Sequence, residues 1–252
     1  MRNRTISIIL GILPLLVFLL LWEFVFAASS ERRFLFSSPS LVYHSFVANI
    51  LNGILIKDII VTGQEAFYGF LIGNIAGALI GLSLWYSKKI ATLTRPYIIA
   101  IGAIPIFSIA PMMIMWFGTG LFAKVMMAAL STVIIAITQS YEGARQVDSQ
   151  QVKLFQSFGA SRTQIFSKLI VPSSLVWLFN SLKLNINFAL LGAFIAEFIS
   201  AEEGLGHRIL KAGGTYDVAL VIASVLCIIL LALFFSGIIY IFEKTLLKWK
   251  LK

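Results

Sequence analysis

The sequence predicts an all-α polytopic membrane protein with about six transmembrane helices. Hydrophobic residues make up 59% of the 252 residues, charged residues make up only 12%, and the mean hydropathy is +0.94. In soluble domains about a quarter of the residues are charged. Several apolar runs also reach the ~20 residues that a helix needs to cross a bilayer. An ordinary soluble domain is therefore excluded.

The first apolar run covers residues 6–28 and follows Arg2 and Arg4. It resembles a signal peptide, but its length and the lack of a small-x-small cleavage pattern favour a retained anchor. Residues 41–57 then mix apolar and polar positions at near-helical spacing. This stretch is too short and polar to span, so we expect an amphipathic helix on the outer membrane surface. Residues 1–60 thus form an N-terminal anchor plus an extracytoplasmic segment.

The second run, residues 62–86, carries a glycine at every fourth position of one helix face. These glycines are Gly69, Gly73, Gly77 and Gly81. Small residues let helix backbones approach closely in lipid, where apolar side chains give no net driving force. We therefore expect this face to pack tightly against a neighbouring helix.

The third run, residues 96–116, contains Pro105 and Pro111. Each proline removes a backbone donor and frees a carbonyl at membrane depth, which is tolerated only where other helices or a water-filled path satisfy that carbonyl. Two interpretations stay open, because the prolines either kink the helix or help to line a translocation path. Both can hold at once.

The remaining runs cover residues 121–139, 169–199 and 218–242. The fifth run of the six is longer than a bilayer requires, so we expect it to begin as an amphipathic turn outside the hydrocarbon core. Near its outer end lies Glu197, which we interpret as structural or gating rather than catalytic.

Lys183 lies inside the fifth run, with Asn180 and Asn187 on the same helix face. A charge at mid-membrane costs ~2.5 kcal/mol or more and persists only where it faces protein or water. We expect this face to point at a dimer interface or a translocation path. Lys183 then either attracts an anionic substrate or pairs with an acid of a neighbouring helix, for which Glu23 and Glu65 are candidates.

Basic residues predict the orientation of the chain. With the N-terminus inside, the cytoplasmic segments hold Arg2, Arg4, Lys88, Lys89, Arg95, Arg145, Lys153, Arg162, Lys168, Lys244, Lys248, Lys250 and Lys252, and the outer segments hold only Arg32, Arg33, Lys57, Lys124, Arg208 and Lys211. Since basic residues concentrate in cytoplasmic loops, both termini and the polar segment 141–168 are expected in the cytoplasm. The net charge of +9 is explained in this way, without nucleic acid as a partner.

The polar segment 141–168 contains Gly159, which lies thirteen residues before Pro172, with Leu169 and Val171 at the apolar positions before that proline. This arrangement resembles the EAA loop of the membrane subunits of binding-protein-dependent ABC importers, the segment that docks on the ATPase subunit. The positions that would hold Glu-Ala-Ala hold Lys-Leu-Phe at 153–155 instead. The resemblance assigns ATPase coupling to Glu142, Lys153, Phe158, Gly159, Ala160, Leu169, Val171 and Pro172.

Two further stretches, residues 104–120 and 196–206, resemble the branch of that family that imports nitrate, sulfonates, taurine and some vitamin precursors. The resemblance implies a type I ABC importer transmembrane domain over residues 61–243, followed by a basic tail at 244–252. It further implies a homodimer in the bacterial inner membrane, two ATPase subunits and an extracytoplasmic solute-binding protein. The translocation path would then be lined by Pro105, Pro111, Asn180, Lys183, Asn187 and Glu197.

No catalytic motif is present in the sequence. It lacks a Gly-x4-Gly-Lys-Ser/Thr phosphate loop, so we expect a partner subunit to use the ATP and this chain to bind no cofactor of its own. His44, His207 and Cys227 are too scattered to predict a metal site. We therefore expect a transport subunit and not an enzyme.

A second hypothesis is a secondary transporter or channel driven by an ion gradient through Glu23, Lys183 and Glu197. Such a protein would not need the docking loop. A membrane-embedded enzyme is a more distant alternative, because no nucleophile, base or metal set is found.

Overall fold

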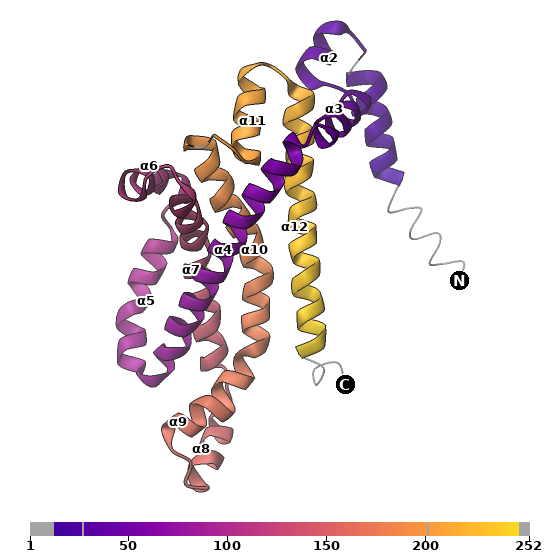
Figure 1. The fold of residues 1–252 in the computed structure, drawn as a ribbon. Helices are drawn as coiled ribbons and strands as arrows, with labels where there is room; N and C mark the ends of the chain where they lie inside the picture. Colours follow the sequence, from indigo (N-terminus) through magenta and orange to yellow (C-terminus); the bar gives the residue numbers. More distant parts are fainter. Residues whose placement is uncertain (1–12, 27, 201, 247–252) are drawn as a thin grey trace, which may run out of the picture.

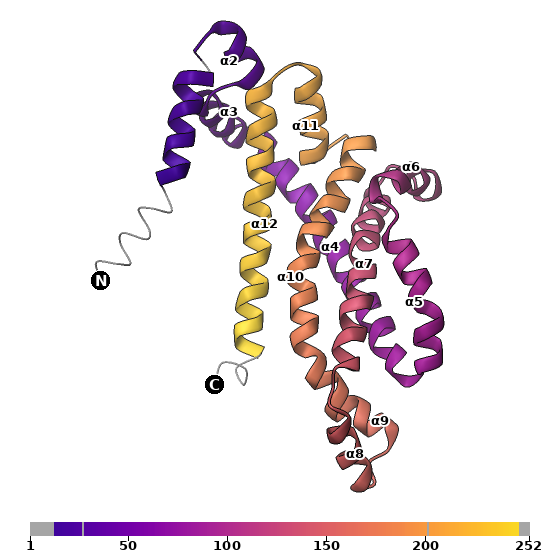
Figure 2. The same cartoon turned by 180° about the vertical axis from the view of Figure 1, so that it is seen from behind.

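The structure, a computed structural model, describes residues 13–26, 28–200 and 202–246, and every regular element in these ranges is a helix. Four long helices run along an elongated bundle (Figures 1 and 2). They are α4 (Ile54–Ser83), α7 (Leu121–Arg145), α10 (Val171–Ser200) and α12 (Val218–Leu246). Each is long and apolar enough to cross a membrane, and two bent helix pairs raise the number of candidate spans to six.

The two ends of the bundle carry different short helices (Figure 1). We call one the hairpin end, because it carries α8 (Ser149–Ser157) and α9 (Arg162–Ile165), and α12 also ends toward it. The opposite end carries α2 (Ser30–Phe36), α3 (Pro39–Leu51) and α11 (Leu205–Gly214). The last turn of α12 and the segment 141–168 thus lie on one side, as the distribution of basic residues requires.

The N-terminal region differs in detail from the prediction. The described part of the first run is helical over Leu13–Phe26, and its last turn is the π-helix η1 (Trp22–Phe26). The expected amphipathic helix over 41–57 was wrong at its C-terminus, because α3 ends at Leu51. Gly53 then takes a φ of 76°, a left-handed conformation that ends a helix, and α4 begins at Ile54.

The glycine face of α4 lies directly on α7. A Cβ atom built on Gly73 would lie 1.9 Å from Thr132 Oγ1, and one on Gly77 would lie 2.4 Å from Ala136 Cβ. Gly69 and Gly81 face the α7 backbone equally closely. Because α4 has no side chain at these four positions, the two helices approach closely, and this helix pair forms the centre of the bundle.

The third span is broken, in agreement with the interpretation that its prolines kink the helix. Residues 88–117 form α5 (Lys88–Gly102) and α6 (Ile106–Phe117), which are bent by 91° relative to each other. Pro105 is the N-cap of α6, where its fixed φ of −62° fits a helix start. Pro111 lies inside α6 without ending it. Only the first proline therefore marks the break.

The fifth span begins earlier than predicted. Helix α9, the π-helix η3 (Phe166–Ile170) and α10 follow one another to give a helical run of 39 residues from Arg162 to Ser200. The connection between the two long helical runs is therefore shorter than the predicted segment 141–168, because α7 continues to Arg145 and the next run begins at Arg162. Two helices of the bundle thus extend into the hairpin end.

Lys124, one of the basic residues assigned to the outer segments, is buried. It lies in the first turn of α7, its side chain is 9% exposed, and its Nζ lies 2.9 Å from Glu65 Oε1 on α4. Since one buried charge needs a partner, the pair adds an ionic contact to the α4–α7 packing.

Candidate functional site

The hairpin end is built from α8, a glycine turn and α9. The Asp148 side chain accepts the Gln150 N–H (2.9 Å) and so begins α8, and Ser161 with Gln164 forms a capping box at the start of α9. Between the helices, Gly159 takes a φ of 74°, and its N–H donates to the Gln156 carbonyl (2.9 Å). The sequence therefore specifies both helix starts and the reversal between them.

The hairpin is fixed to the bundle by an apolar cluster. Ile165, Leu169 and Ile170 are buried against Leu82 of α4 and Ala144 of α7. Partly buried side chains of the hairpin itself, among them those of residues 152 and 155, pack on this cluster. Since both α8 and α9 contribute, the hairpin is attached as one unit to three of the long helices.

Arg162 adds a polar attachment at the same place. Its guanidinium donates to the Tyr86 carbonyl and lies over the rings of Trp85 and Tyr86, 5.7 and 5.5 Å from their centres. These aromatic residues form η2 (Leu84–Tyr86), the short 3₁₀ turn that ends α4. A cation over an aromatic face contributes about 0.5–1 kcal/mol at an exposed site.

The residues predicted to couple to an ATPase separate into two groups. Lys153 is exposed on α8, and Phe158 and Gly159 are exposed at the turn between α8 and α9. The Phe158 side chain is 80% exposed, which is unusual for a large apolar residue. Ala160 is partly covered, and Pro172 is exposed near the start of α10.

The second group faces the protein. Leu169 is only 9% exposed, and Val171 packs on the same apolar cluster. Glu142 lies on α7, where its Oε1 is 2.8 Å from Arg145 Nη2. These residues support the hairpin rather than present its surface.

The polar face of α10 is exposed in the described chain. Asn180, Lys183 and Asn187 all lie on it. Lys183 Nζ lies 2.5 Å from Glu243 Oε2 on α12, so the acid is neither of the two candidates from the sequence. Glu243 lies next to Lys244 at the end of an apolar run, and no spacing rule links it to Lys183.

The two expected partners of Lys183 are engaged elsewhere. Glu65 pairs with Lys124, as described above. Glu23 accepts the Ser40 N–H (3.0 Å) and the Ser40 hydroxyl (2.9 Å), and thereby joins the first helix to the start of α3. Both acids therefore hold helices together.

Glu197 is fully buried and lies apart from the exposed face of α10 that carries Lys183, which agrees with the structural role expected for it. Its Oε1 accepts the Thr62 hydroxyl (2.6 Å), and its Oε2 accepts the Gly206 N–H (2.7 Å). Gly204 takes a φ of 106°, and a Cβ there would lie 2.2 Å from Glu197 Oε1. The residues Ala-Glu and Gly-Leu-Gly thus form one unit that joins α10 to α11.

Asp58 completes this attachment. It accepts the Gly204 N–H (3.0 Å) at Oδ1 and the Arg208 Nε–H (2.7 Å) at Oδ2. Nearby, Lys57 Nζ lies 2.5 Å from Glu203 Oε1, and this contact lowers the pKa of the Glu203 carboxyl below its usual value. Asp58 received no role from the sequence, because an acid next to a lysine at a span end is an ordinary interfacial residue.

Sequence reasoning also missed a buried amide pair in the middle of the bundle. Asn185 Nδ2 on α10 donates to Asn74 Oδ1 on α4 (2.6 Å) and lies 3.2 Å from the Ser181 hydroxyl. Neither residue is more than 7% exposed. The spacing of Asn185 from Ser181 could have indicated this second polar face of α10.

Pro105 is exposed at the bend between α5 and α6, and Pro111 is exposed within α6. In the described ranges, no group of three or more His, Cys, Asp and Glu side chains is placed to hold a metal ion. The buried groups Asp58, Glu65, Asn185 and Glu197 each connect two helices.

Comparison with known proteins shows which protein family has this arrangement of helices. Residues 73–248 match the family model described as "binding-protein-dependent transport system inner membrane component". The chain is 26% identical over 242 residues to the formylaminopyrimidine transport permease protein ThiX of Halalkalibacterium halodurans, covering 95% of this chain and 96% of that protein. It is 24% identical to the putative aliphatic sulfonates transport permease protein SsuC of Bacillus subtilis, covering 95% and 87%.

A solved structure, that of inward-facing conformations of the MetNI methionine ABC transporter, shares the fold. The TM-score is 0.70 at 15% sequence identity, over 78% of this chain and 97% of that chain. The expected fold, a type I ABC importer transmembrane domain, is confirmed. The chain belongs to the family of inner-membrane permease components of binding-protein-dependent ABC importers.

Proposed function

We propose that this chain forms the translocation path of an ATP-driven importer and that the α8–α9 hairpin is the surface on which a separate ATPase subunit docks. The observation that carries the proposal is the projection of the hairpin beyond the ends of α4 and α5 (Figure 1), with Phe158 80% exposed at its tip. An exposed aromatic residue on a rigid support is typical of an interface anchor. The ATPase would use the ATP, and this chain would hold no cofactor.

The mechanism is alternating access driven from the hairpin end. The run from Arg162 to Ser200 has 39 residues and extends about 58 Å at 1.5 Å per residue. It reaches from the hairpin to the Glu197 attachment of α11. A displacement of the hairpin by the ATPase is therefore transmitted along a single helix to the opposite end, where a binding protein would deliver the solute.

A second copy of the chain would complete the path. Asn180, Lys183 and Asn187 are exposed on one face of a helix that otherwise lies in an apolar bundle. Polar groups at membrane depth persist only where they face protein or water. Two copies facing each other through α10 would enclose these side chains and satisfy that condition.

For the transported solute, the relatives suggest a sulfonate-like anion or a vitamin precursor. The contact between Lys183 and Glu243 compensates the positive charge on the α10 face. Because Glu243 compensates the charge of Lys183, this face attracts an anion only weakly, which favours an uncharged or weakly charged vitamin precursor as the solute. The ion-driven alternative is not favoured, because Glu23, Lys183 and Glu197 are each paired in separate places.

The experiment that tests the function has two steps. The chain is purified from membranes to find whether an ATPase subunit copurifies, and the cognate binding protein is titrated with sulfonates and with vitamin precursors by calorimetry. We expect copurification and binding of a vitamin precursor. A chain that purifies alone and transports its solute without ATP would overturn the proposal, while tight sulfonate binding would overturn only the choice of solute.

A further inference from the structure

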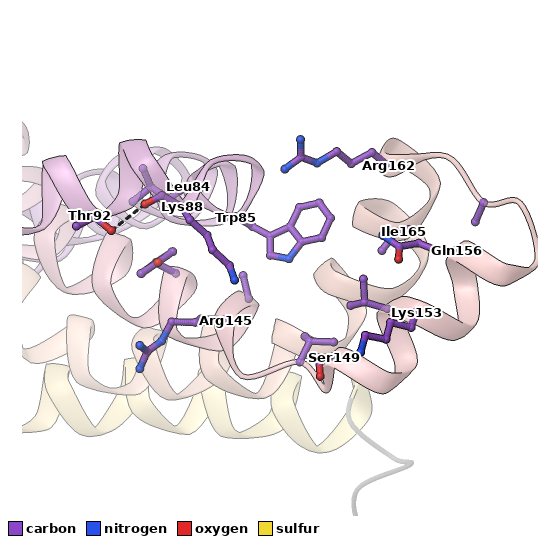
Figure 3. A pocket seen from close by; sticks show the side chains of 15 residues that line it. Leu84, Trp85, Lys88, Thr92, Arg145, Ser149, Lys153, Gln156, Arg162 and Ile165 are labelled. Carbon is purple, nitrogen blue, oxygen red and sulfur yellow. Dashed lines mark hydrogen bonds between the residues drawn. The ribbon is translucent and has the colours of Figure 1, made fainter.

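A groove of about 1040 Å³ lies at the hairpin end, between the α4–α5 turn and α8 (Figure 3). One wall comes from Trp85, Lys88 and Thr92, and the other from the end of α7 and from α8. The groove is open to the surface. It lies at the C-terminal end of α4, between the long helices and the projecting hairpin (Figure 1).

Four basic side chains surround this groove, and none of the residues that line it in the described chain is acidic. They are Lys88, Arg145, Lys153 and Arg162. All four are exposed, and for Lys88 and Lys153 the described chain shows no ion pair. Glu142 pairs with Arg145, and Asp148 next to the groove caps α8. Four basic residues that line the groove thus stand against two acids beside it, so the groove carries a net positive charge.

The rest of the lining is apolar or aromatic. Leu84, Val147, Val152 and Ile165 contribute aliphatic surface, and Trp85 and Tyr141 contribute rings. Tryptophan and tyrosine concentrate at the membrane–water interface, where one end of the side chain is apolar and the other is wet. A ligand with a negative charge next to an apolar body matches this combination.

We propose that the groove binds the headgroup and glycerol region of an anionic phospholipid of the cytoplasmic leaflet. The inference rests on the proposed orientation, in which the hairpin end is cytoplasmic. Basic pockets between transmembrane helices on that side suit anionic headgroups, and Lys88 and Lys153 would supply the attraction while the aliphatic wall takes the start of the acyl chains. A bound lipid would bridge the α4–α5 turn and α8 next to the apolar cluster, whose members Ala144 and Ile165 line the groove, and would thereby stiffen the hairpin.

The test measures the phospholipid retained by the full chain. The chain is purified in detergent, exchanged with mixtures of phosphatidylglycerol and phosphatidylcholine, and analysed by mass spectrometry for lipid bound per chain. We expect the unmodified chain to retain phosphatidylglycerol in preference to phosphatidylcholine. In the double variant Lys88→Gln/Lys153→Gln, the amount of retained phosphatidylglycerol should fall about fivefold for each lysine that is removed. That factor corresponds to about 1 kcal/mol per basic residue near an anionic surface.

The matched control is Lys89→Gln/Lys168→Gln. Both lysines are exposed and do not line the groove, and the net charge change is the same. The control should retain phosphatidylglycerol at the level of the unmodified chain. An equal loss in the control, or equal retention of both lipids by the unmodified chain, would contradict the proposal.

Two further measurements distinguish lipid binding in the groove from a contact of the groove with the ATPase. Retention by the unmodified chain at low and high salt needs no variant, and it should fall with salt because exposed charges are screened. Copurification of the ATPase is scored in the same samples. A groove variant that keeps its phosphatidylglycerol but loses the ATPase would assign the groove to the ATPase contact and overturn the lipid site, leaving the proposed function intact.

Discussion

Gly159 illustrates a residue whose importance comes from its backbone. Its φ of 74° lies in the left-handed region, and no heavy atom lies within 4 Å of the position that a Cβ would take. Space is therefore available for a side chain, but the conformation is costly for an L-residue and worst for a β-branched one.

We expect Gly159→Ile to weaken the turn by about 1–2 kcal/mol and to uncouple transport, because α8 and α9 would no longer meet at the same angle. Gly159→Asn is the matched control, since asparagine tolerates the left-handed region best among the larger residues. Solute uptake and ATPase copurification are compared at equal amounts in the membrane. Undiminished uptake with isoleucine would contradict the assignment of the hairpin to coupling.

Lys183 is a residue whose role depends on its partner. The pair with Glu243 joins α10 to α12, with side-chain exposures of 41% and 18%. Removing one charge leaves the other unpaired next to the membrane interior. The loss should be about 1 kcal/mol, because solvent in a path would screen these charges.

We expect Lys183→Gln to reduce the amount of complex extracted in detergent, and Lys183→Gln/Glu243→Gln to restore it, since the double change leaves no unpaired charge. Uptake is measured beside the amount of complex. If uptake falls while the amount of complex stays normal, Lys183 attracts an anionic solute instead. If both stay normal in the single variant, neither role holds.

At the scale of elements, the closest contact in the bundle joins α4 to α7. Its glycines leave no room for a methyl group, as the 1.9 Å separation between a Cβ at Gly73 and Thr132 Oγ1 shows. In lipid such backbone contacts replace the hydrophobic effect as the source of helix association. The pair is therefore the most sensitive part of the fold to small additions.

We expect Gly73→Ala to destabilise the folded chain by about 1–3 kcal/mol, as overpacking does in a close-packed interior. Gly63→Ala in the same helix is the control, because its Cβ would meet only Leu231 at the ordinary distance of 3.6 Å. Thermal aggregation in detergent, followed by size-exclusion fluorescence, measures both. Equal behaviour of the two variants would mean that the α4–α7 contact can relax.

At the scale of the whole molecule, the two ends of the bundle face different compartments. The hairpin end carries Lys153, and the opposite end carries His44 and Glu202, all three exposed. Cys227, the one cysteine, is buried and 1% exposed. Single cysteines can therefore be placed at chosen surface sites in a Cys227→Ser background.

We expect an impermeant thiol reagent to label cysteine at 44 and 202 in intact cells and to label cysteine at 153 only after the cells are opened. The physical reason is the concentration of basic residues in the segments assigned to the cytoplasm. Labelling at 153 from outside would reverse the orientation and remove the basis for ATPase docking at the hairpin end.

The sequence by itself determined the helical membrane class, most of the long spans and the glycine face of α4. Each depends on information local to one segment, such as apolar length or a period of four. The resemblance of segment 141–168 and of the Ala-Glu and Gly-Leu-Gly residues to those of ABC importer permeases also indicated the family from the sequence alone.

The tertiary structure decided which polar groups meet. Lys183 with Glu243, Lys124 with Glu65 and Glu197 with Gly206 join different elements, and each choice depends on how the helices pack. The bend between α5 and α6 is of the same kind, because a proline permits a break without setting its angle. The pattern of residues in a segment determines which secondary structure it forms. The packing of the helices determines which side chains come into contact, since a buried positive charge pairs with whichever acid the fold brings within reach.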